Sequence, residues 1–251
     1  MINQKNVHIL WTGGLDSTAR MVELSRKPIV IHPYYVIDQG RASTSFEMDA
    51  MRRIRERLLC DPNTIAEILP ITEIIRDEIH PDSVISTSWQ KLNEKYGLGT
   101  QYDFLARYAK ANNIVLELGV EKEEGSRARA SILSEGEMIE IEDFSGCNYK
   151  ISEIESSSDA LAVWRFFTFP LWEKSKLDAV QMMEDLGCGD IVEMTWFCHN
   201  PLLGKPCGHC NPCVDARHYG FSWRIPKSRF FLWYLCRPRI ALKTMIDAVL
   251  R

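Results

Sequence analysis

The stretch Val7-His-Ile-Leu-Trp-Thr-Gly-Gly-Leu-Asp-Ser-Thr18 decides the fold of this chain. Its apolar first half is typical of a buried strand. The strand pattern ends at the pair Gly13-Gly14, and the residues from Asp16 to Thr18 then open a helix. Adjacent glycines let the backbone turn tightly and approach a ligand with no Cβ in the way. The hydroxyls and free N–H groups at the helix start then face an anion, which the helix dipole also favours. The stretch predicts a phosphate-binding turn, and the alternative is a strand-to-helix turn without a ligand.

Four cysteines near the other end of the chain follow the pattern Cys-x8-Cys-x2-Cys-x2-Cys. They are Cys198, Cys207, Cys210 and Cys213. Four thiolates can surround one Zn²⁺ at about 2.3 Å per bond and leave no position for water, so we expect a structural metal. His199 and His209 are the alternative ligands. The other cysteines are scattered and no signal peptide is evident, which favours a reducing, cytoplasmic location over disulfide bonds.

Composition excludes several classes of protein. The chain has 251 residues, of which 45% are hydrophobic, so it can bury a full core. Its formal net charge of −4 argues against a general nucleic-acid binder. No apolar run approaches the roughly 20 residues that cross a bilayer, so we expect no membrane span.

Alternating strand and helix patterns predict an α/β fold with a doubly wound, Rossmann-like parallel sheet. The expected strands are 7–11, 28–36, 65–71, 114–118 and 162–169, and the expected helices are 17–24, 44–59, 101–112 and 174–186. Ligands of such sheets lie beyond the carboxyl ends of the strands. We therefore expect residues 12–18, 38–41 and 119–124 to surround one crevice.

The turn resembles the PP-loop, Ser-Gly-Gly-x-Asp-Ser, of the ATP pyrophosphatases, with Thr12 in place of the first serine. Together with the cysteine motif, it makes residues 6–220 similar to the 7-cyano-7-deazaguanine synthases, enzymes of 7-deazapurine biosynthesis. Two shorter stretches add to the resemblance. Tyr35 to Arg41 is similar to the family's Tyr-Gly-Gln-Arg-His, and Phe169 to Lys176 to its Thr-Pro-Leu before a lysine-containing helix start.

The resemblance implies an ATP-dependent ligase. Such an enzyme adenylates the carboxylate of 7-carboxy-7-deazaguanine, releases pyrophosphate and passes the acid to ammonia. It then dehydrates the amide to the nitrile in a second ATP-dependent step. The cofactors implied are structural Zn²⁺ and Mg²⁺, with ATP as co-substrate.

The resemblance also assigns roles to residues. The expected ATP-binding residues are Trp11, Thr12, Gly13, Gly14, Leu15, Asp16, Ser17 and Thr18. The candidate catalytic residues are Asp16, Ser17, Arg41, Lys174 and Lys176. Asp16 suits Mg²⁺, which prefers hard oxygen ligands, and the basic residues suit charge on the transferring phosphoryl group. Solvated surface charge is the alternative for each basic residue. The candidate substrate contacts are Gln39, Gly40, Gln101 and Glu121.

Three segments are expected along the chain. Residues 1–190 form the ATP-binding α/β domain, and its polar stretch at 121–158 is interpreted as an active-site loop or insertion. Residues 191–221 form the zinc-binding segment. Residues 222–251 form a helical tail that is basic and aromatic.

The sequence departs from the family's pattern at the positions that are expected to recognise the substrate and the acceptor. Arg41 is followed by alanine rather than histidine, the family's Pro-Gly-Arg-Asn has no counterpart, and residues 121–127 replace its Tyr-Pro-Asp-Cys-Arg. The same adenylation step can therefore serve to join the acid to a protein or nucleic-acid amine, as in relatives from anti-phage defence operons. A non-catalytic scaffold is a third hypothesis, but the intact PP-loop residues speak against it.

The tail has two interpretations. From Arg224 to Arg251 it carries seven Lys or Arg residues against one Asp, with four aromatic residues among them. Such a helix can dock a second copy of the chain, a partner protein, nucleic acid or an anionic surface. It can also be a terminal helix that packs its aromatic side chains on the core, which the helical spacing of those residues favours.

Overall fold

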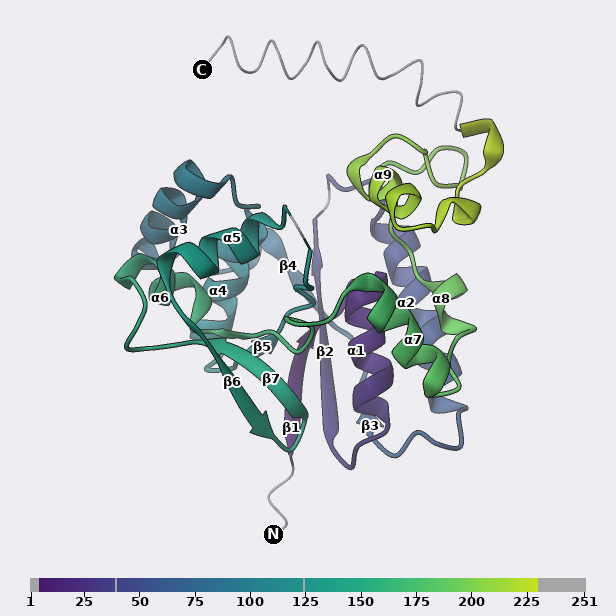
Figure 1. Cartoon of the computed structure of the whole chain (residues 1–251), viewed down its shortest axis with the longest axis horizontal. Helices are drawn as coiled ribbons and strands as arrows, with labels where there is room; N and C mark the ends of the chain where they lie inside the picture. The colour runs from purple at the N-terminus through teal and green to yellow at the C-terminus, as the bar shows by residue number, and fades with distance from the viewer. Residues whose placement is uncertain (1–4, 39, 124, 230–251) are drawn as a thin grey trace.

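The computed structural model describes residues 5–38, 40–123 and 125–229. Its centre is a parallel sheet in the order β3-β2-β1-β5-β8, with β4 also paired to β2 (Figure 1). The strands are β1 (Asn6–Leu10), β2 (Val30–Ile37), β3 (Glu67–Ile68), β4 (Thr72–Ile75), β5 (Leu116–Glu117) and β8 (Phe167–Thr168). The predicted α/β class with a parallel central sheet is confirmed.

Helices cover both faces of the sheet (Figure 1). One layer holds α1 (Leu15–Ser25), α2 (Thr44–Leu59), α7 (Lys176–Asp185) and α8 (Ile191–Met194). The other holds α3 (Ser83–Tyr96), α4 (Gln101–Ala111), α5 (Arg127–Glu135) and α6 (Ser158–Trp164). Each layer packs its own apolar core against the sheet. Among the described residues, no helix combines the length and the apolar character that crossing a membrane requires.

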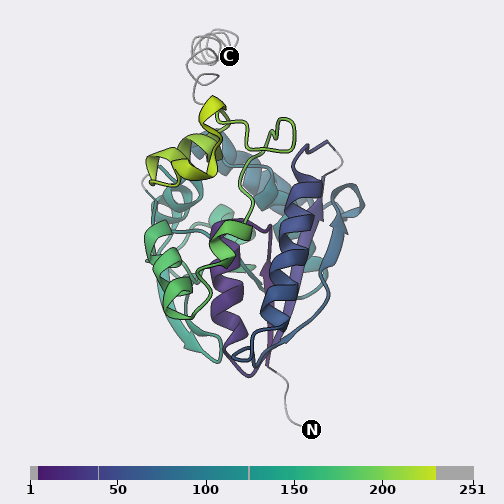
Figure 2. The ribbon, with the colours of Figure 1, turned by 90° about the vertical axis from the view of Figure 1, so that its right-hand side faces the viewer.

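The cysteine-containing segment lies at the end of the molecule toward which β2 runs. It includes α9 (Asn211–His218) and the short 3₁₀ helix η2 (Ser222–Arg224). Figure 2 shows this green-to-yellow segment above α1 and α2, so it closes over the carboxyl ends of the strands. Of the tail expected at 222–251, residues 230–251 lie outside the described residues.

Two predicted strands differ in the structure. The strand expected at 65–71 is divided into β3 and β4 around Pro70, because proline donates no ladder hydrogen bond. The strand expected at 162–169 is wrong in its first half, which belongs to α6. The Ser157 side chain caps this helix by accepting from the Ala160 N–H at 3.2 Å, a signal that outweighs the apolar run.

Of the two interpretations of residues 121–158, an active-site loop or an insertion, the loop is wrong. This stretch contains α5 and an antiparallel hairpin of β6 (Met138–Asp143) and β7 (Gly146–Ile151). Gly146 adopts a φ of +101° directly after the turn, a conformation that glycine reaches without strain. The Phe169 N–H donates to the Tyr149 carbonyl at 2.8 Å, which joins the hairpin to the segment after β8.

A buried ion pair joins α1 to β5. Arg20 donates through Nε to Oε2 of Glu117 and through Nη2 to Oε1, both at 2.7 Å. Both side chains are almost fully buried, and Asn148 on β7 donates to the same carboxylate at 3.0 Å. A buried carboxylate needs such partners to offset its lost hydration. The pair therefore holds three elements in one arrangement.

We predict that Glu117→Gln destabilises the fold. The substitution leaves the Arg20 guanidinium buried without its main counter-charge, which costs about 3–5 kcal/mol of unfolding free energy. Urea denaturation followed by circular dichroism measures this loss. Glu67→Gln, at an exposed position on β3, is the matched control and should change the free energy by less than about 0.5 kcal/mol. Equal stabilities of the two variants would contradict the prediction.

Candidate functional site

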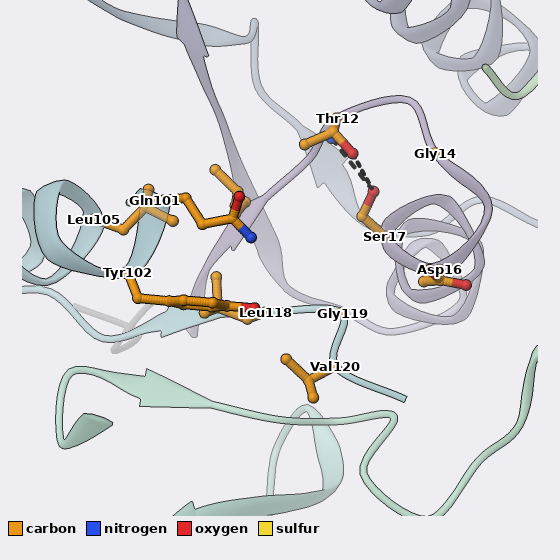
Figure 3. A pocket seen from close by; sticks show the side chains of 11 residues that line it. Thr12, Gly14, Asp16, Ser17, Gln101, Tyr102, Leu105, Leu118, Gly119 and Val120 are labelled. Carbon is orange, nitrogen blue, oxygen red and sulfur yellow. Dashed lines mark hydrogen bonds between the residues drawn. The ribbon is translucent and has the colours of Figure 1, made fainter. Parts of the chain in front are cut away.

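The Gly-Gly turn places the start of α1 at the carboxyl end of β1. Gly14 is the N-cap residue, and the Thr18 N–H makes the first helical bond, to the Gly14 carbonyl at 3.1 Å. The N–H groups of residues 14–17 precede that bond and have no partner within the helix. Ser17 Oγ accepts from the Thr12 N–H at 3.3 Å and lies 3.4 Å from Thr12 Oγ1 (Figure 3). Hydroxyls and N–H donors therefore meet at one point, which suits an anion.

Three of the predicted ATP-binding residues support the turn from behind. The Trp11 indole donates to Thr18 Oγ1 at 3.0 Å, and both side chains are buried. Gly13 has a φ of +67°, and a Cβ there would lie 3.0 Å from the Glu47 carbonyl and 3.1 Å from the Met51 side chain. These three residues line neither of the two cavities described next, so their contribution is to shape the turn.

The first cavity lies between the carboxyl ends of β1 and β5, with a volume of about 170 Å³. In this strand order, β1 is where the order reverses, which is the position that ligands occupy in open α/β sheets. Its apolar wall is Leu10, Leu105, Leu118 and Val120. Its polar lining is Thr12, Gly14, Asp16, Ser17 and Gln101, with Tyr102 beside Gln101. Figure 3 shows Gln101 and Tyr102 opposite the turn. The cavity suits a flat ring whose anionic group reaches the start of α1.

An acidic cluster lies beside the turn. A Cβ on Gly119 would lie only 3.2 Å from the Ser17 N and 3.3 Å from the Asp16 Cβ, so this glycine lets the segment after β5 reach α1. Lys176 contacts Glu121 Oε1 directly and lies 3.9 Å from Asp16 Oδ2. Asp16 Oδ1 and Glu121 Oε2 are buried and have no hydrogen-bond partner in the described part of the chain.

Electrostatics show that ionising both carboxyl groups of this cluster is unfavourable while no cation is bound. Burial, and next the charge of Asp16, raise the pKa of Glu121 to about 8. Burial also raises the pKa of Asp16 above its ordinary value. Burial alone would lower the pKa of Lys176, but the carboxylates of Asp16 and Glu121 outweigh it and raise that pKa. Two carboxylate oxygens without partners beside one ammonium fit a divalent cation with oxygen ligands, such as Mg²⁺.

A second cavity, of about 230 Å³, lies between the turn and the cysteine-containing segment. It shares Thr12, Gly14 and Asp16 with the first cavity. Its aromatic lining is Trp196, Phe197 and Phe221, and its charged lining includes Arg41, Lys176, Asp215 and Arg224. Because the two cavities meet at the turn, two ligands can approach the same anion site from opposite sides.

Arg41 reaches the second cavity through a buried network after β2. Glu47 accepts from the Tyr35 hydroxyl at 2.8 Å and the Ser43 hydroxyl at 2.7 Å. It also forms an ion pair with Arg41 Nη2 at 2.9 Å. Burial, and next the charge of Glu47, raise the pKa of Tyr35, so this tyrosine keeps its proton and donates it. The network holds the Arg41 guanidinium beside the turn.

Some of the remaining predicted site residues line a cavity, and others do not. The structure brings Asp16, Ser17, Arg41 and Lys176 to the two cavities, with Gln101 in the first and Leu15 in the second. Lys174 instead lies 3.7 Å from Glu23 and lines neither cavity. Gly40 is exposed, with its N–H donating to Asp38 Oδ1 at 3.1 Å, and Gln39 lies outside the described residues.

Sequence reasoning missed the aromatic and charged lining of the second cavity. Trp196, Phe197, Asp215, Phe221 and Arg224 lie near the cysteines in sequence. Their only signal was that an aromatic pair directly precedes Cys198 and that charged residues follow Cys213. Neither observation says which side chains face the turn.

The four cysteines form one buried cluster. Their sulfurs all lie within 4.8 Å of one another, and two pairs, Cys207–Cys213 and Cys198–Cys210, are 3.9 Å apart. A Zn²⁺ ion with bonds of about 2.3 Å separates its sulfurs by about 3.8 Å. Backbone N–H groups of residues 207, 209 and 210 donate to the Cys198 and Cys207 sulfurs, which stabilises thiolates. The cluster can therefore hold a metal ion, and neither nearby histidine belongs to it.

We predict that purified protein contains about one zinc per chain and that Cys213→Ser removes it, since three thiolates bind less tightly than four. Elemental analysis by plasma mass spectrometry measures the metal. Cys60→Ser, at an exposed position after α2, is the control and should keep the zinc. Retention of zinc by the Cys213 variant, or its loss from the control, would contradict this assignment.

Comparison with protein-family models gives no match for this chain, and comparison with curated proteins gives none either.

Proposed function

We propose that this chain is an ATP-dependent ligase that adenylates a 7-carboxy-7-deazaguanine-like acid and passes it to an amine. The observation that carries the proposal is the position of the Asp16–Glu121–Lys176 cluster. It lies at the start of α1, where the two cavities meet. A reaction between a nucleotide and a second substrate needs such a junction, because both reactants must reach one phosphorus atom.

Each part of the site has a role in this reaction. The first cavity takes the adenine ring of ATP, and the free N–H groups of residues 14–17 bind the pyrophosphate that leaves. The second cavity takes the acid, whose carboxylate oxygen attacks the α-phosphorus. Pyrophosphate departs and an acyl adenylate remains. The amine then attacks the acyl carbon and AMP leaves.

Four side chains control charge at this site. Asp16 and Glu121 would hold Mg²⁺ through the oxygens that have no other partner. The metal, when bound, neutralises charge on the triphosphate. Lys176 lies against both carboxylates and keeps its positive charge near the phosphates, while Arg41 approaches from the second cavity.

The cysteine cluster supports the site structurally in this proposal. With four thiolates bound, zinc has no open position for chemistry. The metal orders the segment that forms one wall of the second cavity. The Trp196 N–H at the start of that segment donates to the Gly13 carbonyl at 2.8 Å, so the segment contacts the turn directly.

We predict that the protein forms AMP and pyrophosphate from ATP only when Mg²⁺ and 7-carboxy-7-deazaguanine are both present. Mass spectrometry of the reaction identifies the products. With ammonium, the amide or nitrile should appear. AMP without a new small molecule would instead favour a protein or nucleic-acid amine as acceptor. Absence of AMP under all of these conditions would sink the proposal.

We predict that Asp16→Asn lowers the rate of pyrophosphate release by at least about 100-fold, because it removes a charged oxygen ligand from the phosphate site. Zinc content and unfolding temperature should remain those of the unmodified protein. Asp185→Asn, at the exposed end of α7, is the matched control and should retain full activity. Loss of zinc from the Asp16 variant would show that its effect is structural rather than catalytic.

A further inference from the structure

Two charged side chains in the second cavity have no counter-charge in contact. Asp215, on α9, makes no side-chain hydrogen bond or ion pair with the described residues. The Arg224 guanidinium donates to the Thr195 carbonyl but has no carboxylate within ion-pair distance in the same part of the chain. Burial lowers the pKa of Arg224 to about 10, which still leaves it charged at neutral pH.

Burying charged groups without partners costs free energy, unless a ligand supplies the missing hydrogen bonds. Asp215 offers carboxyl oxygens as acceptors. Arg224 offers N–H donors from the same cavity, since only part of its guanidinium is engaged by the Thr195 carbonyl. The ligand must therefore carry N–H donors for one side chain and an oxygen acceptor for the other.

The walls of the cavity restrict the shape of that ligand. The Trp196 ring stacks on Phe46 with centroids 4.6 Å apart, and its indole N–H donates to the Cys198 carbonyl at 2.8 Å. The Phe197 ring lies under the Arg224 guanidinium, 4.7 Å from centroid to carbon. These rings are held in place before any ligand arrives. Rigid aromatic walls favour a flat ring.

We propose that the second cavity selects a planar heteroaromatic acid by a guanine-type edge, with Asp215 accepting from its ring N–H and amino group and Arg224 donating to its carbonyl. A carboxylate facing two adjacent N–H donors makes two charge-assisted hydrogen bonds, and a guanidinium matches the neighbouring carbonyl. Rings that lack the amino group leave Asp215 partly unpaired.

The other end of the cavity agrees with this assignment. Gly14, Asp16 and Lys176 also line it, on the side shared with the first cavity. A ligand whose edge lies at Asp215 and Arg224 can direct its carboxylate to the turn. The inference rests on the proposed function, and it adds the residues that choose the substrate.

The test compares two acids, 7-carboxy-7-deazaguanine and the same molecule without its 2-amino group. Calorimetry on the zinc-loaded 251-residue chain without ATP measures binding of each acid, and AMP formation measures turnover. The unmodified protein should prefer the amino-bearing acid by at least about 100-fold. Asp215→Asn should weaken binding of that acid by about 10- to 100-fold and reduce the preference below about tenfold.

Two further variants complete the design. Arg224→Gln should weaken both acids by similar factors, because both carry the carbonyl. Asp185→Asn should change neither affinity. Zinc content and unfolding temperature are measured for each variant, so that a misfolded cysteine-containing segment is recognised. If the Asp215 variant misfolds, the affinities of the Arg224 variant for the two acids decide the test.

Each outcome has one meaning. Unchanged affinity and preference in folded Asp215→Asn overturn the inference, even if the protein makes AMP as proposed. Equal binding of the two acids by the unmodified protein, or no binding of either, overturns it as well. Selective binding that depends on Asp215 but yields no AMP supports the inference and refutes the proposed ligase activity.

Discussion

The bidentate contact between Arg20 and Glu117 is the constraint on which the candidate site depends. Arg20 lies one helical turn after Asp16, and Glu117 lies four residues before Glu121. The 2.7 Å contacts between Arg20 and Glu117 hold α1 against β5, and they therefore set where Asp16 and Glu121 meet. The absence of a side chain on Gly119 allows the approach. An interaction buried beneath the site thus determines the geometry at its surface.

The junction of two cavities at one turn explains why the site contains unpaired polar atoms. A site that binds two substrates cannot pair all of its charges internally, because the substrates must supply some of the partners. Asp16 and Glu121 leave carboxylate oxygens unpaired beside the turn. In the second cavity, Asp215 and Arg224 leave one charge of each sign. The two sets differ in chemistry, as the proposed phosphate site and the proposed ring-recognition site require.

Local chemistry was predictable from the sequence, and long-range placement was not. The Gly-Gly turn and the four cysteines depend on residues adjacent or closely spaced in the chain, so their patterns sufficed. The hairpin at 138–151 was missed although Ile139 to Glu142 alternates between apolar and charged residues, because the polar composition of the whole stretch 121–158 was taken to indicate a loop or insertion. The positions of Asp215 and Arg224 follow from how the cysteine-containing segment folds back on the turn, which no local sequence pattern indicates. Glu121 was predicted as a substrate contact, but its pairing with Lys176 emerged only in three dimensions.

The hydrogen bond from Trp196 to the Gly13 carbonyl has a consequence for the growing polypeptide. Gly13 leaves the ribosome early, whereas its partner is synthesised more than 180 residues later. N-terminal regions fold first during translation. The Gly-Gly turn of a nascent chain therefore lacks this hydrogen bond until the last quarter of the protein is made. Premature termination before that point leaves the turn without its hydrogen bond from Trp196.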